Sequence, residues 1–288
     1  MQTIRNPIEW GNDALKQAAT ALTTSARAMG GTEEGRALAP PVVRRIEVTD
    51  LREVLAKGFS DFGACRTDVI FLCLVYPIAG LILARAAFGA DLLPLLFPLA
   101  SGFALIGPVA GVGLYEMSRR RERGEEVSWA AAFGVVGAPS FGSIIVLALA
   151  LGALFVLWLV AAQIIYNLTL GPAPPASIEA FLRDVFLTGA GWTMIVVGMG
   201  VGFLFAVAAL AISVVSFPML VDRGVSLGTA VGTSIRAVTS NLVPMAAWGL
   251  IVAAGLVLAS IPFFVGLIVV MPVLGHATWH LYRKVVAT

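Results

Sequence analysis

The hydrophobic and polar positions divide the chain into long apolar runs separated by short polar segments. A helix of about 20 apolar residues crosses the roughly 30 Å of hydrocarbon in a bilayer. Backbone polar groups in lipid must find partners within the chain, so we expect these runs to be helices. The pattern predicts six transmembrane helices, at about 68–88, 92–117, 141–166, 191–217, 242–260 and 262–281.

The short alternating segments typical of a membrane barrel do not occur between residues 68 and 281. We therefore expect an all-α polytopic membrane protein. A single helix over 242–281 would reach some 60 Å, so we place a turn at Ser260–Pro262. A further short helix is expected near 176–187, after a Pro-rich segment.

The first part of the chain has a different pattern. Asn6, Pro7 and Glu9 are typical of a helix start, and apolar residues then recur at helical spacing. We predict an amphipathic helix over 7–29, resting on lipid or on a partner protein. The alternative is a loosely helical tail. Residues 30–47 are expected to be a linker. The predicted division is thus 1–47, a cytoplasmic segment, and 48–288, a transmembrane domain.

Composition agrees with a membrane location. Hydrophobic residues make up 59% of the chain and charged residues 12%, against roughly 25% charged in soluble domains. The formal net charge is +2, and the basic residues lie beside the spans, so we expect lipid rather than nucleic acid as the partner. Cys65 and Cys73 are the only cysteines, and we expect both to stay reduced.

The basic residues also set the orientation, because Lys and Arg are enriched in cytoplasmic loops. Of the 19 Lys and Arg residues, all but Arg85 and Arg183 fall on one side of the predicted topology. We therefore expect both termini in the cytoplasm and the segment 171–187 outside.

Three cytoplasmic segments resemble one another. Each begins with Val and a hydroxyl residue suited to a helix N-cap, as follows: Val48-Thr49, Val127-Ser128 and Val225-Ser226. Arg123-Gly124 and Arg223-Gly224 precede the second and third. We predict three repeats, each an interfacial helix followed by a transmembrane hairpin, around a pseudo-threefold axis.

The first of these segments has a distinct amphipathic pattern. Asp50 and Glu53 fit a capping box. Its apolar face comprises Leu51, Val54, Leu55, Phe59 and Phe62. The opposite face comprises Arg52, Glu53, Lys57 and Asp61.

His276 and His280 are the only histidines, and they share a helix face at i and i+4. Such a pair can bind a metal ion or supply a haem ligand. The alternative is that they form hydrogen bonds near the cytoplasmic end of the last span. In that case Trp279 and Tyr282 would be interfacial aromatic anchors, with Arg119, Arg120 and Arg121 as basic anchors of the loop after the second span. Two histidines without a nearby carboxylate make a poor metal site, so we expect no cofactor.

The spans carry no acid or base at mid-depth, where ion and proton pathways usually place one. Gly107 and Gly111, and likewise Gly198 and Gly202, are four residues apart and suit close helix packing in lipid. No nucleophile elbow, phosphate loop or metalloprotease motif is found in the sequence. We therefore expect a protein that is not an enzyme.

The segment from Pro272 to Arg283, with the Arg-Gly and Val-Ser segments, resembles a bacterial family of integral membrane proteins known as domain of unknown function 2189. The resemblance extends from about residue 45 to the end. It implies a bacterial inner-membrane location and no established activity. Some members carry a cytochrome c oxidase subunit label, but the catalytic subunit needs about six histidines on several helices, and this chain has 2.

Three functions are compatible with these patterns. The first is an accessory or assembly subunit of a membrane complex of respiratory type, binding other membrane-protein subunits. The second is a transporter or channel built from the three hairpins. The third is a haem- or metal-binding redox protein using His276 and His280.

Overall fold

The computed structural model describes residues 41–73, 92–128 and 132–287, together with positions 78, 80–82 and 85. The side chains of residues 66–73, Phe103 and Ile106 are not among those described. The predicted helix at 7–29 and most of the linker at 30–47 lie outside the described residues. So does much of the predicted first span at 68–88.

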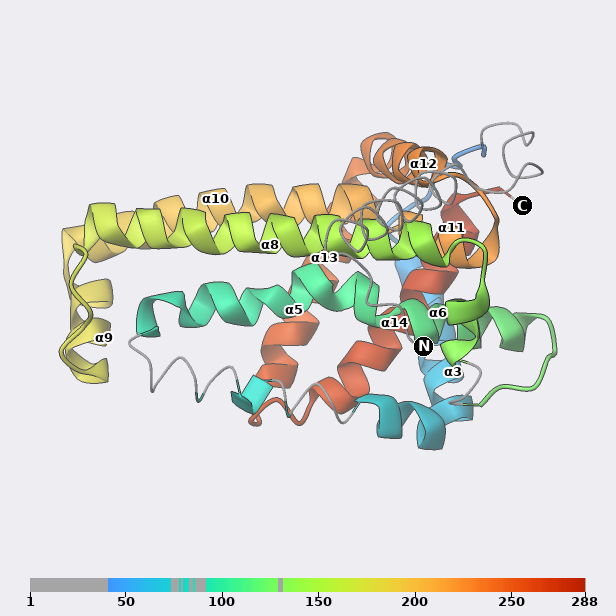
Figure 1. Cartoon of the computed structure of the whole chain (residues 1–288), viewed down its shortest axis with the longest axis horizontal. Helices are drawn as coiled ribbons and strands as arrows, with labels where there is room; N and C mark the ends of the chain where they lie inside the picture. Colours follow the sequence, from blue (N-terminus) through green and yellow to red (C-terminus); the bar gives the residue numbers. More distant parts are fainter. Residues whose placement is uncertain are drawn as a thin grey trace, which may run out of the picture.

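The described residues are helical and contain no β-strand, as the sequence predicts (Figure 1). The first half of the described chain forms α3 (Asp50–Cys73), η1 (Leu93–Leu95), α5 (Leu96–Ala110), α6 (Val112–Glu122), η2 (Phe133–Gly137) and α8 (Phe141–Thr169). The second half forms α9 (Ile178–Leu187), α10 (Gly189–Ser213), α11 (Ser216–Asp222), α12 (Leu227–Ser240), α13 (Leu242–Ser260) and α14 (Leu267–Val285).

Three stretches of the described chain are long and apolar enough to cross a membrane. They are α8, the stretch Gly189–Asp222 that holds α10 and α11, and α13. In Figure 1, α8 and α10 run side by side, and α9 crosses their far ends. The helix α13 matches its predicted bounds, and α8 continues three residues beyond the predicted end at 166.

The second predicted span, 92–117, is divided rather than continuous. A 3₁₀ turn precedes α5, and Gly111 separates α5 from α6. Pro108 lies inside α5 and has no N–H to give to the preceding turn. The helical hydrogen bonds resume at once, since the Gly111 N–H donates to the Gly107 carbonyl at 2.8 Å. The division is therefore a local kink, and α6 extends the segment to Glu122.

The fourth predicted span, 191–217, is interrupted between Ser213 and Ser216. Both serine hydroxyls donate to carbonyls four residues earlier, at 2.6 and 2.7 Å. Such back-bonding bends helices, and Pro218 removes a further hydrogen bond of the following turn. The apolar stretch therefore continues as α11 after a short break.

The last predicted span, 262–281, begins five residues later than expected. Phe263 and Phe264 adopt positive φ values of 50° and 63° in the turn after α13. The turn is tight, because a Cβ on Gly266 would lie 2.7 Å from the backbone of Ala259. The helix α14 can start only after this reversal, at Leu267.

Helix α3 packs antiparallel to α14. Lys284 pairs with Asp50, and Gly58 lies against Ala277. Five residues of α3 at spacings of three and four form its buried row: Leu51, Val54, Gly58, Asp61 and Cys65. This corrects the predicted apolar face, since Phe59 is 58% exposed and Asp61 is buried. The close crossing at Gly58 sets the rotation of α3 and thereby draws Asp61 inward.

The three segments that the sequence predicts to be cytoplasmic have different structures. In the first, α3 runs without a break from Asp50 into the start of the predicted span. In the second, the structure describes the 3₁₀ turn η2 before α8, and residues 129–131 lie outside the described residues. In the third, α12 is a full helix whose N-cap Ser226 accepts from the N–H of Thr229 at 3.1 Å. Among the residues that the structure describes, the third segment has the predicted form of a separate helix before a hairpin.

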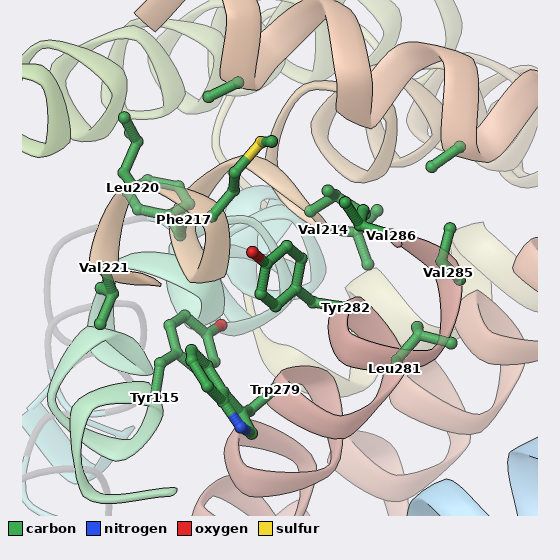
Figure 2. Packing of buried hydrophobic residues seen from close by; sticks show 14 of the residues in the cluster. Tyr115, Val214, Phe217, Leu220, Val221, Trp279, Leu281, Tyr282, Val285 and Val286 are labelled. Atoms are coloured by element: carbon green, nitrogen blue, oxygen red, sulfur yellow. The ribbon is translucent and has the colours of Figure 1, made fainter. Parts of the chain in front are cut away.

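The main core lies where α6, α11 and α14 meet. Figure 2 shows Tyr115, Phe217, Trp279 and Tyr282 gathered there. The rings of Trp279 and Tyr282 lie 5.6 Å apart. Both side chains are buried within the chain, so they do not face lipid headgroups as interfacial anchors would.

The two ends of the described chain lie together. Val43 pairs with Val286, and the Ala287 N–H donates to the Val42 carbonyl at 3.0 Å. The buried side chain of Asn241 accepts from the Ile46 N–H and donates to the Arg44 carbonyl. The segment before α3 and the end of α14 are therefore joined on one side of the molecule.

Candidate functional site

A buried polar cluster forms where α3, α6 and α14 meet. Asp61 comes from the buried row of α3, Ser118 from α6, and His276 and His280 from α14. Asp61 is 6% exposed and His276 is fully buried. Buried polar groups are costly unless they are hydrogen-bonded, so the pairing within this cluster decides its role.

Asp61 is the centre of the cluster. Its Oδ2 accepts from the Ser118 hydroxyl at 2.6 Å and lies 2.9 Å from His280 Nε2. Its Oδ1 accepts from the Arg121 guanidinium. Burial raises the pKa of Asp61, but hydrogen bonds from His280 and Ser118 outweigh it, so the pKa lies below its usual value. Asp61 is therefore a carboxylate and acts only as an acceptor.

These bonds assign the tautomer of His276. Ser118 has one hydroxyl hydrogen and gives it to Asp61, while His276 Nδ1 lies 2.7 Å from the Ser118 oxygen. The His276 Nδ1–H must then donate to Ser118. The neutral ring consequently has its lone pair on Nε2, which is buried and has no hydrogen-bond partner. The Leu114 carbonyl of α6 also faces the ring.

The order of the groups decides what they can do chemically. In a hydrolytic triad, His lies between Ser and Asp and takes the proton from the serine hydroxyl. Here Ser118 lies between Asp61 and His276, and its hydrogen points to the carboxylate. Ser118 is therefore not activated as a nucleophile, and the cluster joins three helices through hydrogen bonds.

The two histidines do not present their Nε2 atoms to one ligand. His280 Nε2 is engaged with Asp61, and only His276 Nε2 is left open. Within the described ranges, no group of three or more His, Cys, Asp and Glu side chains could hold a metal ion. Asp61 supplies the carboxylate that the sequence around the histidines lacks, and it comes from a position 219 residues away.

A second polar cluster lies beside the main core at the ends of α6, α11 and α14. Asp222 accepts from the Tyr282 hydroxyl at 2.7 Å, and its carboxylate lies 3.5 Å from guanidinium nitrogens of both Arg223 and Arg283. Glu122 accepts from Trp279 Nε1 at 3.1 Å. These bonds account for the polar atoms of the two buried aromatic residues.

The three predicted basic anchors are paired within the chain. Arg119 and Arg120 both form ion pairs with the buried Glu116, at 2.8 Å each, and Arg121 pairs with Asp61. Partial exposure of the three side chains leaves them able to meet lipid headgroups as well. Their first role in this structure is to neutralise carboxylates on α6 and α3.

The four predicted packing glycines differ in their surroundings. A Cβ on Gly202 would lie 3.0 Å from Trp158 of α8, whereas one on Gly107 would make only an ordinary contact with Met271 at 3.9 Å. Gly111 adjoins Tyr115 of the next turn, and nothing lies within 4 Å of a Cβ on Gly198. A closer helix crossing than those at Gly107 and Gly202 lies at Gly58, where a Cβ would lie 2.7 Å from Ala277 Cβ.

Much of the apolar surface of the long helices is uncovered. In the most apolar part of the stretch Gly189–Asp222, only 6% of the residues are buried within the chain. The corresponding share for α13 is 28%. Exposed side chains of α10 include Trp192, Val196, Met199, Phe203, Leu204 and Val207. An apolar surface of this extent marks contact with a membrane or with another protein.

Residues 96–222 match the family described as predicted integral membrane protein, domain of unknown function 2189. The match begins with α5 and ends with α11. It includes the Arg123-Gly124 and Val127-Ser128 segments but not residues 272–283, on which the resemblance chiefly rests. No curated protein and no solved structure matches the chain. Residues 96–222 are therefore similar to this family of integral membrane proteins, and the membrane-length helices of the described chain agree with that similarity.

Proposed function

We propose that the protein is a non-catalytic subunit of a complex in the bacterial inner membrane, where it acts as an accessory or assembly factor of a respiratory-type complex. The observation that carries the proposal is the uncovered surface of α10. This helix contributes few residues to the chain's own core. Its exposed side therefore has room for a second protein as well as for lipid.

The small residues of α10 indicate where a partner helix would lie. A Cβ on Gly198 or Gly200 would meet nothing within 4 Å. Association of helices in lipid depends on close van der Waals contact, which glycine permits. Because α8 already occupies the space beside Gly202, a partner would approach along the part of α10 that α8 leaves open.

The polar cluster supports a structural rather than a catalytic role. Ser118 gives its hydrogen to Asp61. The three side chains that bond to Asp61 or His276 are Ser118, Arg121 and His280, and they come from α6 and α14, which pack together. This arrangement, in which hydrogen bonds secure α3 and α6 to α14, supports a structural role for the cluster.

We propose further that the chain crosses the membrane six times, as three hairpins, with both ends in the cytoplasm. The pairing of Val43 with Val286 supports an even number of crossings, since it places the beginning of the transmembrane domain beside the C-terminal end. The excess of basic residues on that side supports the cytoplasmic assignment.

The experiment is a tagged purification from native membranes in a mild detergent, with mass spectrometry of the eluate. Wild-type protein is compared with Gly198→Leu combined with Gly200→Leu, and with Gly152→Leu as the matched control. Gly152 is an equally open glycine, on α8. We expect stoichiometric co-purification of other membrane subunits with wild type and control, and at least a severalfold loss with the α10 variant.

Two results would count against the proposal. One is a wild-type protein that is recovered alone in each mild detergent. The other is equal recovery of the same partners with the α10 variant, which would place the contact elsewhere. An absorption spectrum of the same eluate tests the haem alternative, because a haem bound at His276 would give a Soret band.

A further inference from the structure

Helix α9 is fixed across the far ends of α8 and α10 (Figure 1). Ser177 caps it by accepting from the Ala180 N–H at 3.1 Å. Thr188 caps α10 by accepting from the Gly191 N–H at 3.0 Å. The turn between them is tight, because a Cβ on Gly191 would lie 2.2 Å from the Val185 carbonyl oxygen. The direction of α9 is therefore set by its junction with α10.

One row of α9 is apolar and uncovered. Ile178, Leu182 and Phe186 recur at four-residue spacing, and each is about half exposed. The neighbouring Val185 is buried against the hairpin, so the row lies beside the packed face rather than within it. Glu179 and Arg183 lie on the remaining, polar side of the helix, and the Arg183 side chain is 69% exposed.

The position of Trp192 indicates the depth of α9 in the membrane. Trp192 is exposed in the first turn of α10, and its Nε1 donates to the Phe186 carbonyl at 3.1 Å. Exposed tryptophans of membrane proteins concentrate at the boundary between hydrocarbon and headgroups. This hydrogen bond brings the C-terminal end of α9 to the same level.

The apolar row is continuous with surfaces already assigned to the membrane. Leu168 at the end of α8 and Leu187 at the end of α9 are both strongly exposed, at 81% and 78%. They join the row to the uncovered apolar sides of α8 and α10, which cross the bilayer. Lipid is the one partner that would contact the exposed apolar sides of all three adjoining helices.

We infer that α9 is an interfacial membrane anchor, with Ile178, Leu182 and Phe186 inserted among the lipid acyl chains and Arg183 at the headgroups. Amphipathic helices in this position bury their apolar face about 5–10 Å into the boundary region. Anchored in this way, α9 holds the end of the long α8–α10 hairpin at a defined depth. This role is independent of whether α10 binds a partner.

The test is site-directed spin labelling of the full chain in vesicles of phosphatidylethanolamine and phosphatidylglycerol. Cys65 and Cys73 are first replaced by Ala, and a label is then attached at Leu182→Cys or at Phe186→Cys. Arg183→Cys is the matched control on the polar side of the same helix. Size-exclusion chromatography and circular dichroism establish that each labelled protein is folded before it is measured.

We expect the labels at 182 and 186 to collide with oxygen, which dissolves in hydrocarbon, and to be shielded from a water-soluble nickel chelate. The label at 183 is expected to show the reverse, with the oxygen-to-nickel ratio lower by severalfold. Equal access of nickel to 182 and 183 would overturn the inference, because the row would then face water. Shielding of 182 and 186 from both reagents would also overturn it, since protein rather than lipid would cover the row.

Discussion

At the scale of single residues, Asp61 makes more polar contacts than any other member of the polar cluster. Its carboxylate accepts from Ser118 and Arg121 and lies against His280, although the residue is almost fully buried. Removing an acceptor from such a site leaves several donors without partners. A buried donor that is left without a partner costs more free energy than a typical hydrogen bond contributes to stability.

We therefore predict that Asp61→Asn, which keeps the shape of the side chain, destabilises the protein by about 1.5–3 kcal/mol, as expected for hydrogen bonds to a charged group. Thermal unfolding in detergent, followed by circular dichroism, measures the change. Glu125→Gln in an exposed loop is the control and should leave the melting temperature unchanged. Equal melting curves for Asp61→Asn and wild type would mean that the cluster contributes nothing to stability.

A second residue-scale prediction concerns pH. Hydrogen bonds from Lys284 and Lys57, with their charges, lower the pKa of Glu53 from 4.5 to about 2. A carboxylate with a lowered folded-state pKa stabilises the protein above its unfolded pKa, and this contribution is lost as pH falls through the folded value. Asp50, held by the Glu47 N–H and by Lys284, shifts in the same direction.

We expect the melting temperature to fall between about pH 4.5 and pH 2, with part of the fall due to the contact of α3 with Lys284. The variant Lys284→Met should show a smaller fall over the same range. Because these groups are exposed, the difference should shrink in high salt. Parallel pH profiles for the two proteins at low salt would contradict the assignment.

At the scale of the helix, the crossing of α3 and α14 depends on Gly58. The atoms that a Cβ would meet include the Ala277 N and the Val273 carbonyl oxygen, both at 2.8 Å. These are backbone atoms and cannot move aside as the end of a long side chain can. Helix α3 must shift as a whole if the glycine is replaced.

Gly58→Ala is expected to destabilise the protein by about 1–3 kcal/mol through overpacking. Gly63→Ala on the same helix is the matched control, because a Cβ there meets nothing within 4 Å. This second change should stabilise the protein slightly, by about 0.5–1 kcal/mol, since alanine favours the helix. Thermal unfolding of the two variants distinguishes a packing effect from a general effect of alanine. If the Gly58→Ala protein were as stable as the Gly63→Ala protein, the close crossing would be excluded.

At the scale of the whole molecule, the structure has a broad end with the core and both polar clusters, and an extended end formed by α8, α9 and α10 (Figure 1). The beginning of α3 and the end of α14 are joined at the broad end through Asn241 and the pairing of Val43 with Val286. This end carries most of the basic residues, so we propose that it faces the cytoplasm.

The orientation can be measured in intact cells with a membrane-impermeant maleimide. In a chain without its native cysteines, Ala173→Cys should react from outside, whereas Glu125→Cys should react only after lysis. Both positions are exposed in the structure. Reaction of Glu125→Cys in intact cells would reverse the proposed topology, and reaction of both would indicate a mixed population.

The sequence alone determined the helical class and the position of the most apolar spans, because hydrophobicity and length are local properties that a bilayer selects directly. The pattern of apolar and polar residues predicted the bounds of α13 and the presence of the short helix α9. The cap at Ser226 did as well, since it depends on neighbouring residues only.

Tertiary structure decided which side of each helix is buried. The amphipathic pattern of α3 predicted that Asp61 faces outward, but the close approach of Gly58 to Ala277 rotates the helix and buries the carboxylate. Trp279 and Tyr282 have the composition of an aromatic belt, yet the packing of α6 and α11 on α14 encloses them in the core. The partnership of Asp61 with His280, across 219 residues, depends on two helices meeting in space, which hydrophobic periodicity along one chain segment does not encode.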